Sequence, residues 1–566
     1  MKMQSTAEQP WLEKYPTEIP KNIIYDKKPL HDYLFESALN GADKKAIHFL
    51  GKELTFEEVL SEAKKTAHYL QQNGLKKGDR VASMLPNSPQ AVITYYGTLM
   101  AGGIVVQVNP LYTERELEYQ LKDSGATFIV CLDILLPRVN NIKSNTNIKH
   151  TIVTAIKDYL PFPKNIIYPF VQKRQHKMTV NVAETKTTHI WKNMIENTTE
   201  NYQKVEINPF EDLALIQYTG GTTGYPKGVM LTHYNLVANV TMATNWMHKM
   251  EKNKEVVLGV LPFFHVYGMT TVMNLSIMFG AKMVLLPQFD AAEILKTIEK
   301  LKPTLFPGAP TIYIGLLNHP DLTKYNLSSI KACISGSAPL PLDVQNKFEE
   351  VTGGRLVEGY GLTESSPVTH ANLVWGKRIN GSIGLPWPDT DAKIVDSKTH
   401  KELPIGETGE LIVKGPQIMK GYWNNPEATD AVLKDGWLFT GDIGYTTEDG
   451  FFYVVDRQND MIIAGGYNIY PREVEEILFE HEGILEAAVV GVSHSYRGET
   501  VMAVIVLKDG YNLTEKELNK YSRKYLAAYK VPRIYKFVKE LPKTSVGKVL
   551  KKDIVRDYER QNKQAN

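Results

Sequence analysis

The chain of 566 residues is longer than a single hydrophobic core usually supports, so we expect at least two domains. Its content of 43% hydrophobic and 23% charged residues is typical of a water-soluble globular protein. The net charge of +2 argues against nucleic acid as the main partner, because that role needs a concentrated basic face.

The two ends of the chain carry no signal for export or lipid attachment. Residues 1–20 lack the apolar core of a signal peptide, and the final residues RQNKQAN match no C-terminal address or lipidation motif. Cys131 and Cys333 lie in strand-like runs, which predicts buried thiols in a reducing compartment. We therefore expect a cytoplasmic protein.

The segment 158–178 departs from the regular pattern of the chain and allows two interpretations. It could rest on the inner face of an anionic membrane, or it could be an irregular excursion packed on its own domain. The first interpretation depends on its alternation of aromatic and basic side chains, namely Tyr159, Phe162, Tyr168, Phe170, Lys164, Lys173, Arg174 and Lys177.

Strand-like and helix-like segments alternate through most of the chain, which predicts a layered α/β protein. The capping-box spacing of Asp290 and Glu293 predicts a helix that Pro303 ends. A second helix is expected from Pro471 onward, inside a small α/β unit that begins near residue 460. Residues 256–281 are uncharged and long enough to span a bilayer, but internal Gly and Pro residues predict a buried core segment instead.

The stretch YTGGTTGYPKG, residues 218–228, follows a buried strand-like run. It is not a Walker A loop, because Gly224 is followed by Tyr225-Pro226-Lys227 rather than by Lys and a hydroxyl residue. Its glycines would still let backbone N–H groups approach an anion, aided by hydroxyls and by the Lys227 cation. The stretch therefore predicts a phosphate-binding loop, with a plain mobile turn as the alternative.

Further along the chain, several short motifs contain polar residues with more than one interpretation. His265 lies in the aromatic stretch LPFFHVYGM, where a histidine is more often a core residue than a site residue. Glu364 in EGYGLTESS is a candidate ligand for Mg²⁺, a hard cation that prefers oxygen. The remaining motifs are SGSAPL (335–340), GWLFTGD with Asp442, VVDRQND with Arg457, GGYNIYPREVE (465–475) and LPKTSVGKVLKK with Lys548.

In this order and spacing the motifs resemble the AMP-forming acyl-CoA synthetase, adenylation and luciferase superfamily, over residues 30–555. The form of the glycine loop, the opening PWLEKYPTEIP and the 158–178 segment look most like bacterial long-chain-fatty-acid–CoA ligases. The resemblance implies a large N-terminal domain, 1–457, of layered sheets and helices with a small β-barrel-like subdomain. It also implies a small, mobile α+β C-terminal domain, 458–566, that carries the catalytic lysine.

The resemblance further implies a first step in which a carboxylate attacks the α-phosphate of ATP to give acyl-AMP and pyrophosphate. Lys548 would bridge the two reacting anions, and Glu364 with Thr219 would hold Mg²⁺. The positions expected to bind the nucleotide are Thr219, Gly220, Gly221, Thr222, Thr223, Gly224, Lys227, Gly336, Ser337, Ala338, Gly359, Tyr360, Gly361, Thr363, Asp442, Arg457 and Lys548.

The resemblance implies that the C-terminal domain then rotates and that the thiol of coenzyme A attacks the acyl carbonyl. Gly466 and Tyr467 would border the CoA tunnel, and His265 would adjoin the acyl carbonyl and reorient between the steps. The family hinge position is commonly Asp or Lys, whereas this chain has Asn459. Asparagine tolerates unusual backbone angles, so a hinge is retained as an expectation.

The resemblance also implies an acyl pocket, whose lining in this sequence is small and apolar and suits an alkyl chain of medium to long length. Each buried methylene contributes about 0.8 kcal/mol, so neighbouring chain lengths should be poorly separated. Four alternatives stay open: an aryl-acid (4-coumarate-type) CoA ligase, a luciferase-like oxygenase, an amino-acid adenylating domain and a peripheral membrane lipid-transport protein. A homodimer is also left open. The residues expected to line the pocket are Trp246, Tyr267, Gly268, Met269, Ala309 and Gly336.

Overall fold

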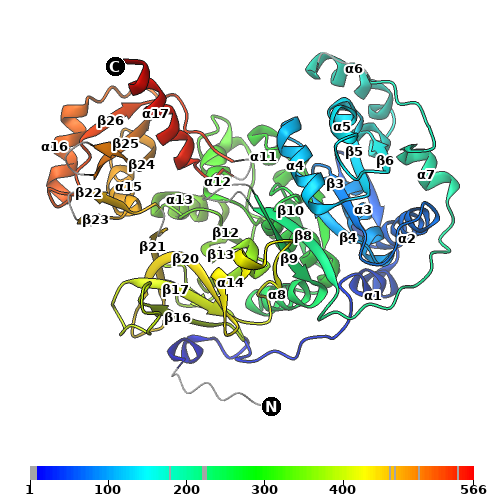
Figure 1. The fold of residues 1–566 in the computed structure, drawn as a ribbon, viewed down its shortest axis with the longest axis horizontal. Helices are drawn as coiled ribbons and strands as arrows, with labels where there is room; N and C mark the ends of the chain where they lie inside the picture. The colour runs from blue at the N-terminus through cyan, green and yellow to red at the C-terminus, as the bar shows by residue number, and fades with distance from the viewer. Residues whose placement is uncertain are drawn as a thin grey trace.

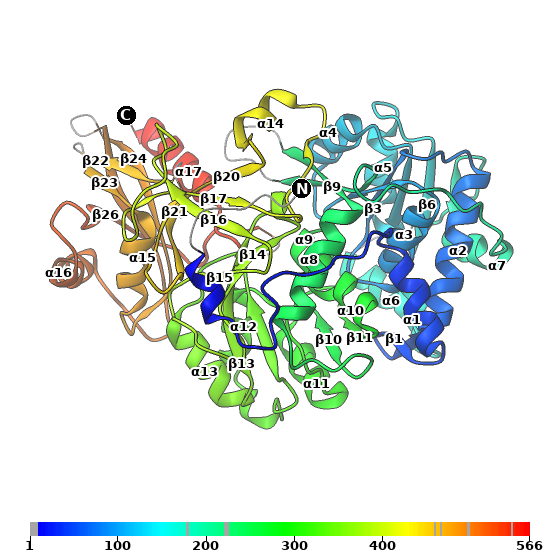
Figure 2. The same cartoon turned by 90° about the horizontal axis from the view of Figure 1, so that it is seen from below.

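The computed structural model describes residues 9–176, 180–219, 226–457, 460–464, 467–494, 498–544 and 547–565. Helices and sheets are layered throughout, as predicted (Figure 1). The C-terminal elements form a separate lobe beside the larger N-terminal body, and Figure 2 shows the same separation from below. The prediction of an α/β protein with a large N-terminal part and a small C-terminal part is therefore confirmed.

The first sheet has eight strands in the order β18-β9-β8-β4-β3-β5-β6-β7. The pairs from β8 to β7 are parallel, whereas β8–β9 and β9–β18 are antiparallel. Helices cover both faces, which explains why its strands are almost continuously apolar. The strands are β3 (Arg80–Met84), β4 (Ile104–Gln107), β5 (Phe128–Leu132), β6 (His150–Thr154), β7 (Thr188–Ile190), β8 (Leu213–Thr219), β9 (Lys227–Thr232) and β18 (Gly421–Tyr422). The helices are α2 (Phe56–Gln72), α3 (Pro89–Met100), α4 (Glu114–Ser124), α5 (Leu136–Lys143) and α7 (Trp191–Asn197).

A second layer consists of two four-stranded sheets, β10-β11-β1-β2 and β12-β13-β14-β15. Leu305 joins them, because it bridges to Val257 of one sheet and to Ala332 of the other. The strands are β1 (Lys45–Phe49), β2 (Lys52–Thr55), β10 (Val256–Gly259), β11 (Lys282–Leu285), β12 (Ala332–Ser335), β13 (Arg355–Gly361), β14 (Val368–Ala371) and β15 (Leu385–Pro386). The helices are α1 (Asp32–Gly41), α8 (His233–Trp246), α9 (Val266–Gly268), α10 (Leu275–Phe279), α11 (Ala291–Leu301), α12 (Pro310–Leu317) and α13 (Leu342–Thr352).

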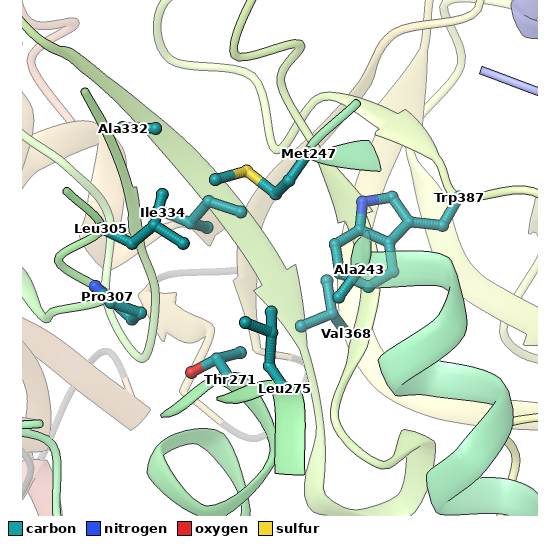
Figure 3. A pocket seen from close by; sticks show the side chains of 10 residues that line it. All are labelled: Ala243, Met247, Thr271, Leu275, Leu305, Pro307, Ala332, Ile334, Val368 and Trp387. Carbon is teal, nitrogen blue, oxygen red and sulfur yellow. The ribbon is translucent and has the colours of Figure 1, made fainter. Parts of the chain in front are cut away.

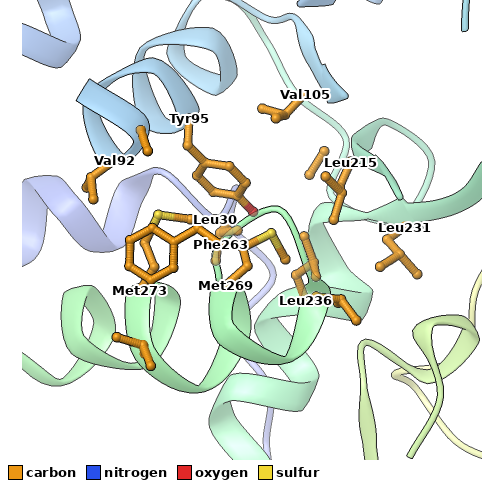
Figure 4. Close-up of a cluster of buried hydrophobic side chains, with 14 of the residues drawn as sticks. Leu30, Val92, Tyr95, Val105, Leu215, Leu231, Leu236, Phe263, Met269 and Met273 are labelled. Carbon is orange, nitrogen blue, oxygen red and sulfur yellow. The ribbon is translucent and has the colours of Figure 1, made fainter. Parts of the chain in front are cut away.

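The uncharged stretch 256–281 belongs to the core between these layers, as predicted. It contains β10, α9, a π-helical turn η4 (Met269–Asn274) and α10. Figure 4 shows Phe263, Met269 and Met273 from this stretch beside Val92 and Tyr95 of α3. Over the described residues, no helix has the length and apolar character needed to cross a membrane.

A third sheet, antiparallel and five-stranded, follows the second layer, and the C-terminal lobe has a five-stranded sheet of its own. The buried hydrophobic side chains described in the C-terminal lobe form two clusters, one on each face of its sheet. The third sheet comprises β16 (Asp391–Val395), β17 (Gly409–Lys414), β19 (Leu433–Lys434), β20 (Trp437–Thr446) and β21 (Phe452–Arg457), beside α14 (Pro426–Val432). The C-terminal lobe comprises β22 (Ile462–Ala464), β23 (Tyr467–Ile469), β24 (Ile484–His494), β25 (Gly498–Leu507), β26 (Ile534–Phe537), α15 (Pro471–Phe479), α16 (Glu515–Tyr525) and α17 (Lys551–Ala565).

Several local predictions can be compared with these elements. The helix expected after Asp290 is α11, and the Asp290 side chain accepts a hydrogen bond from the Glu293 N–H, as an N-cap does. Cys131 and Cys333 are buried and unpaired. Most of the described part of the 158–178 segment is regular, because it forms helix α6 (Lys164–His176). The segment nevertheless packs on its own domain, through the buried Tyr159, Leu160 and Gln172, while Lys177 lies outside the described residues.

Candidate active site

The predicted phosphate loop is the connection of a β-hairpin. Thr219 is the last residue of β8, Lys227 is the first of β9, and the two residues face each other across the antiparallel pair. The loop residues Gly220, Gly221, Thr222, Thr223 and Gly224 lie outside the described residues. The buried strands β8 and β9 therefore hold both ends of the loop at one edge of the first sheet.

Tyr422, which the sequence did not single out, connects two of the predicted site residues. Its hydroxyl donates a 2.8 Å hydrogen bond to Glu364 Oε1, and Lys227 Nζ lies 4.9 Å from the centre of its ring. Backbone pairing holds this arrangement, since β18 pairs with β9 and the Met419 N–H donates to the Glu364 carbonyl at 2.8 Å. Tyr422 thus contacts both Glu364 and Lys227, although it is far from both in the sequence.

The residues expected to bind adenosine lie at neighbouring strand ends. Gly336 to Ala338 directly follow β12, and Gly359 to Gly361 end the adjacent parallel strand β13. The Tyr360 hydroxyl donates a short hydrogen bond to Asp442 Oδ2. Asp442 in turn faces Arg457 across the β20–β21 pair. These predicted residues therefore lie close together, at the carboxyl ends of the parallel strands β12 and β13 and on β20 and β21 of the third sheet.

The predicted Mg²⁺ ligand Glu364 and its neighbour Thr363 are on a short 3₁₀ turn that follows β13. No other carboxylate, histidine or cysteine joins Glu364 in a cluster of metal-ligand type within the described part of the chain. One carboxylate with a nearby threonine hydroxyl is an oxygen donor set that Mg²⁺ accepts when phosphates and water supply the rest. The residues present therefore fit a phosphate-bound Mg²⁺ rather than a site made by protein alone.

His265 lies at the start of α9, and its Nδ1 accepts a 3.3 Å hydrogen bond from the Tyr267 N–H. Burial, with a smaller contribution from the charge of Lys548, lowers the pKa of His265 from 6.5 to about 4. The ring is therefore neutral at physiological pH, and a cation from the C-terminal lobe lies close to it.

The turn that carries Lys548 reaches from the C-terminal lobe into the N-terminal body. Its backbone closes on Thr544, whose N–H donates to the Lys548 carbonyl at 2.8 Å and whose Oγ1 accepts from the Lys548 N–H at 3.1 Å. Gly547 has a φ of +79°, and a Cβ there would lie 2.1 Å from Thr311 Oγ1 of α12. Glycine is required at this point because both the backbone angle and the contact with α12 exclude a side chain.

An apolar cavity of about 30 Å³ lies between α8, the η4–α10 segment and the second layer (Figure 3). Its lining includes none of the six residues expected to form an acyl pocket. Trp246 is fully buried beside it, donating to the Asn372 carbonyl, and Met269 belongs to the core of Figure 4. Tyr267 adjoins the cavity through Ile334, whose carbonyl accepts its hydroxyl at 2.7 Å. The lining residues are Ala243, Met247, Thr271, Leu275, Leu305, Pro307, Ala332, Ile334, Val368 and Trp387.

The remaining predicted residues near the start of the C-terminal lobe are only partly placed. Tyr467 begins β23, which pairs with β22. Gly466 and the expected hinge residue Asn459 lie outside the described residues. Ala309, which was predicted to line the acyl pocket, is buried against Leu261 and Tyr267. It directly precedes α12, the helix that contacts the Lys548 turn.

Fold and site together define a two-part α/β protein in which the turn with Lys548, from the C-terminal lobe, contacts α12 of the N-terminal body. The chain belongs to the AMP-binding enzyme family: that family model matches residues 34–423, and the AMP-binding enzyme C-terminal domain matches residues 473–548. The C-terminal match ends at Lys548 and begins one residue after Arg472.

Similar proteins extend over nearly the whole chain. A long-chain-fatty-acid–CoA ligase of Bacillus subtilis is 58% identical over 97% of this chain and 98% of its own length. The crystal structure of ATP-bound MatB from Rhodopseudomonas palustris is 30% identical, covers 94% of this chain and 98% of its own, and has a TM-score of 0.82. The apo form of the same protein has the same identity and coverage but a TM-score of 0.72. The arrangement described here is thus closer to the ATP-bound form.

Proposed function

We propose that the protein is a fatty acid–CoA ligase for medium to long chains, which converts ATP, a fatty acid and CoA into acyl-CoA, AMP and pyrophosphate. The observation that carries the proposal is the position of the Lys548 turn, which lies against α12 and places the charge of Lys548 near enough to lower the pKa of His265. The similarity to the Bacillus subtilis ligase over the full chain supports the choice of acid. Such an enzyme serves fatty-acid degradation or lipid synthesis.

In the first reaction, a carboxylate oxygen attacks the α-phosphorus of ATP and the bond to the β-phosphate oxygen breaks, releasing pyrophosphate. Two anions meet in this step, so positive charge and N–H donors lower its barrier. Lys548 would hold the carboxylate against the α-phosphate, while Lys227 and the 219–227 hairpin would hold the leaving phosphates. Asp442 would accept from the ribose hydroxyls, with Arg457 assisting.

Mg²⁺ would be held by Glu364 and the Thr219 hydroxyl, and when bound it would neutralise charge on the leaving phosphates. Tyr422 donates to one oxygen of Glu364, so it would fix the orientation of that carboxylate. Lys227 above the ring of Tyr422 is held toward the same phosphates. These residues position an anionic leaving group without themselves forming or breaking bonds.

In the second reaction the CoA thiolate sulfur attacks the acyl carbonyl carbon, and AMP leaves with the bonding electrons. We propose that the C-terminal domain, from residue 458 onward, rotates about Asn459 between the two reactions. This movement would withdraw Lys548 and bring Gly466 and Tyr467 to the CoA tunnel. Neutral His265 would then lie beside the acyl carbonyl.

The choice of acid is tested by giving purified protein ATP, Mg²⁺, CoA and a panel of alkyl, aryl and amino acids. We expect initial rates of AMP formation to be greatest within the C12–C18 alkyl acids, because the described cavity offers apolar side chains to the acid. Rates at neighbouring lengths should be similar. Faster turnover of 4-coumarate or another aryl acid than of palmitate would replace this proposal with the aryl-acid alternative.

We also propose that the enzyme contacts anionic membranes through the 162–174 surface, which comprises helix α6 as far as Arg174 and the two residues before the helix. This surface exposes large apolar side chains beside basic ones, a combination that binds the interface of an anionic bilayer. Phe162 and Phe170 are 78% and 74% exposed. The other members are Ile166, Ile167, Lys164, Lys173 and Arg174, and Figure 1 shows α6 at the outer edge of the N-terminal body.

Replacing Phe162 and Phe170 with serine, or Lys173 and Arg174 with glutamine, should weaken binding to vesicles that contain anionic lipid by about tenfold. The basic-residue variant should lose its defect at high salt, whereas the aromatic variant should keep it. Ile405→Ser, which changes a 54% exposed side chain in the turn between β16 and β17, is the matched control. Unchanged vesicle sedimentation of both variants would dismiss the membrane role.

A further inference from the structure

Arg472, at the start of α15, makes several contacts between the C-terminal lobe and the N-terminal body. Its backbone N–H donates to Asp456 Oδ2 at 2.9 Å, and its Nη1 donates to the Val454 carbonyl at 2.6 Å. Both partners are on β21, before the expected hinge. Its Nε bonds to Glu476 of its own helix at 3.0 Å, which holds the side chain in this direction.

The same guanidinium also reaches a buried carboxylate of the N-terminal body. Arg472 Nη2 lies 3.8 Å from Glu358 Oε1, and the two side chains are 12% and 8% exposed. The other oxygen of Glu358 accepts the Leu340 N–H at 3.2 Å. Glu358 immediately precedes Gly359, so this ion pair adjoins the strand end where the adenosine is expected.

If Arg472 moves away from this position, the free energy of the buried, ionised Glu358 carboxylate rises. Burial raises the pKa of Glu358, and the charge of Arg472 is the largest influence that lowers it. A buried carboxylate that loses its cation must be hydrated, protonated or paired anew, each at a cost in free energy. The partners Val454, Asp456 and Glu358 all precede residue 458, so a rotation of the C-terminal lobe about residues 458–459 would strain or break these contacts of Arg472.

We propose that Arg472 is a positioning residue whose contacts with Glu358 and β21 hold the C-terminal lobe in the orientation that delivers Lys548. It acts through Lys548 and does not itself touch the reacting atoms. The pair biases the enzyme toward the adenylate-forming arrangement, and its breakage is part of the cost of the turn to the thioester-forming one. This role rests on the proposed two-step function, and the sequence motif GGYNIYPREVE gives no sign of it.

The orientation is measured directly with two labels, one on each lobe. Cysteines introduced at Lys324 and Lys516, both exposed, accept spin labels selectively because Cys131 and Cys333 are buried. Distance distributions are recorded by pulsed electron paramagnetic resonance on the full chain without substrates. Four backgrounds are compared: unaltered, Arg472→Met, Glu358→Gln and the double variant. Arg556→Met is the control, since Arg556 pairs with Asp553 inside the C-terminal lobe.

We expect Arg472→Met to lower the ratio of the present orientation to all others about fivefold, and Glu358→Gln to lower it by a smaller factor. The double variant should be no worse than Arg472→Met, because the two residues act as a pair. Arg472→Lys should restore part of the ratio through its charge. An unchanged distance distribution in both single variants would overturn the proposal.

The two half-reactions give a second, independent result. Arg472→Met should slow acid-dependent exchange of pyrophosphate into ATP about fivefold while sparing thioester formation from supplied acyl-AMP. Equal loss of both half-reactions would indicate a general structural defect and overturn the positioning role. If the Arg472→Met protein showed a shifted distance distribution but the unaltered protein activated no acid, the positioning role of Arg472 would be supported and the proposed function rejected. The two claims can therefore fail separately.

Discussion

Replacing Lys548 with alanine will slow acyl-adenylate formation on the order of 100-fold or more, as measured by pyrophosphate exchange into ATP. The lysine is the cation that the C-terminal lobe brings close to His265, on a turn that fits against Thr311. Without it, the carboxylate and the α-phosphate repel each other with less compensation. Thioester formation from pre-made acyl-AMP should be largely retained, since the turn is expected to withdraw before that reaction.

The control for this variant is Lys552→Ala, an exposed lysine four residues further on in α17. It removes the same charge from the same lobe without changing the turn that reaches α12. Equal losses in the two half-reactions of Lys548→Ala would contradict the two-orientation account. A similar loss in Lys552→Ala would mean that the net charge of the lobe, rather than one lysine, matters.

Replacing Ala243 with leucine will reduce activity toward C16–C18 acids about 10- to 100-fold while sparing C8–C10 acids. Ala243 is buried in α8 and lines the apolar cavity of Figure 3, so a larger side chain there fills the space that a long chain needs. Overpacking of this kind costs about 1–3 kcal/mol, and each 1.4 kcal/mol is a factor of ten in rate. The cavity of about 30 Å³ is itself smaller than a long acyl chain, so binding must also displace lining side chains.

Met247→Ala tests the same pocket in the opposite direction. Methionine is flexible and fills irregular gaps, and its removal should favour longer acids relative to shorter ones. Ala291→Leu, at the start of α11 and outside the cavity lining, is the size-matched control for Ala243→Leu. Chain-length profiles of both cavity variants that match the unaltered enzyme would show that the acyl chain binds elsewhere.

Local features of the fold were predictable because they depend on neighbours in the sequence. The helix after Asp290 follows from a capping side chain and a repeating apolar face, and the buried cysteines follow from the apolar runs that contain them. The glycine loop was recognised as a separate type from the Walker A loop, and its flanks form one hairpin. The alternation of strand-like and helix-like segments predicted a layered α/β protein, with a small α/β unit from about residue 460, but not the order of the strands in any sheet.

Contacts between distant segments were not predictable in this way. Tyr422 is one tyrosine in a turn-like GYWNNP stretch, and only the pairing of β18 with β9 brings it to Glu364 and Lys227. The sequence singled out neither Arg472 nor Glu358, because they lie 114 residues apart and only the folded chain brings them together. The cavity lining likewise comes from segments whose side chains face each other only in the folded protein, which is why it differs from the predicted set.

The secondary structure of the exposed 162–174 surface was also not predictable from the sequence. The sequence indicated aromatic and basic residues but left their secondary structure open, because Pro169 and the mixed composition obscure a helical period. The helix α6 forms nevertheless and leaves its apolar side chains in solvent. A contiguous patch of exposed apolar side chains beside polar ones is typical of a protein or membrane interaction site.

The most direct test of the account is the nucleotide released when palmitate, CoA, Mg²⁺ and ATP are given to the purified protein, as in the acid panel above. We expect the protein to release AMP and pyrophosphate in equal amounts only when palmitate is present, and to form one palmitoyl-CoA for each AMP. Release of ADP and phosphate, or nucleotide release that does not depend on the acid, would contradict it.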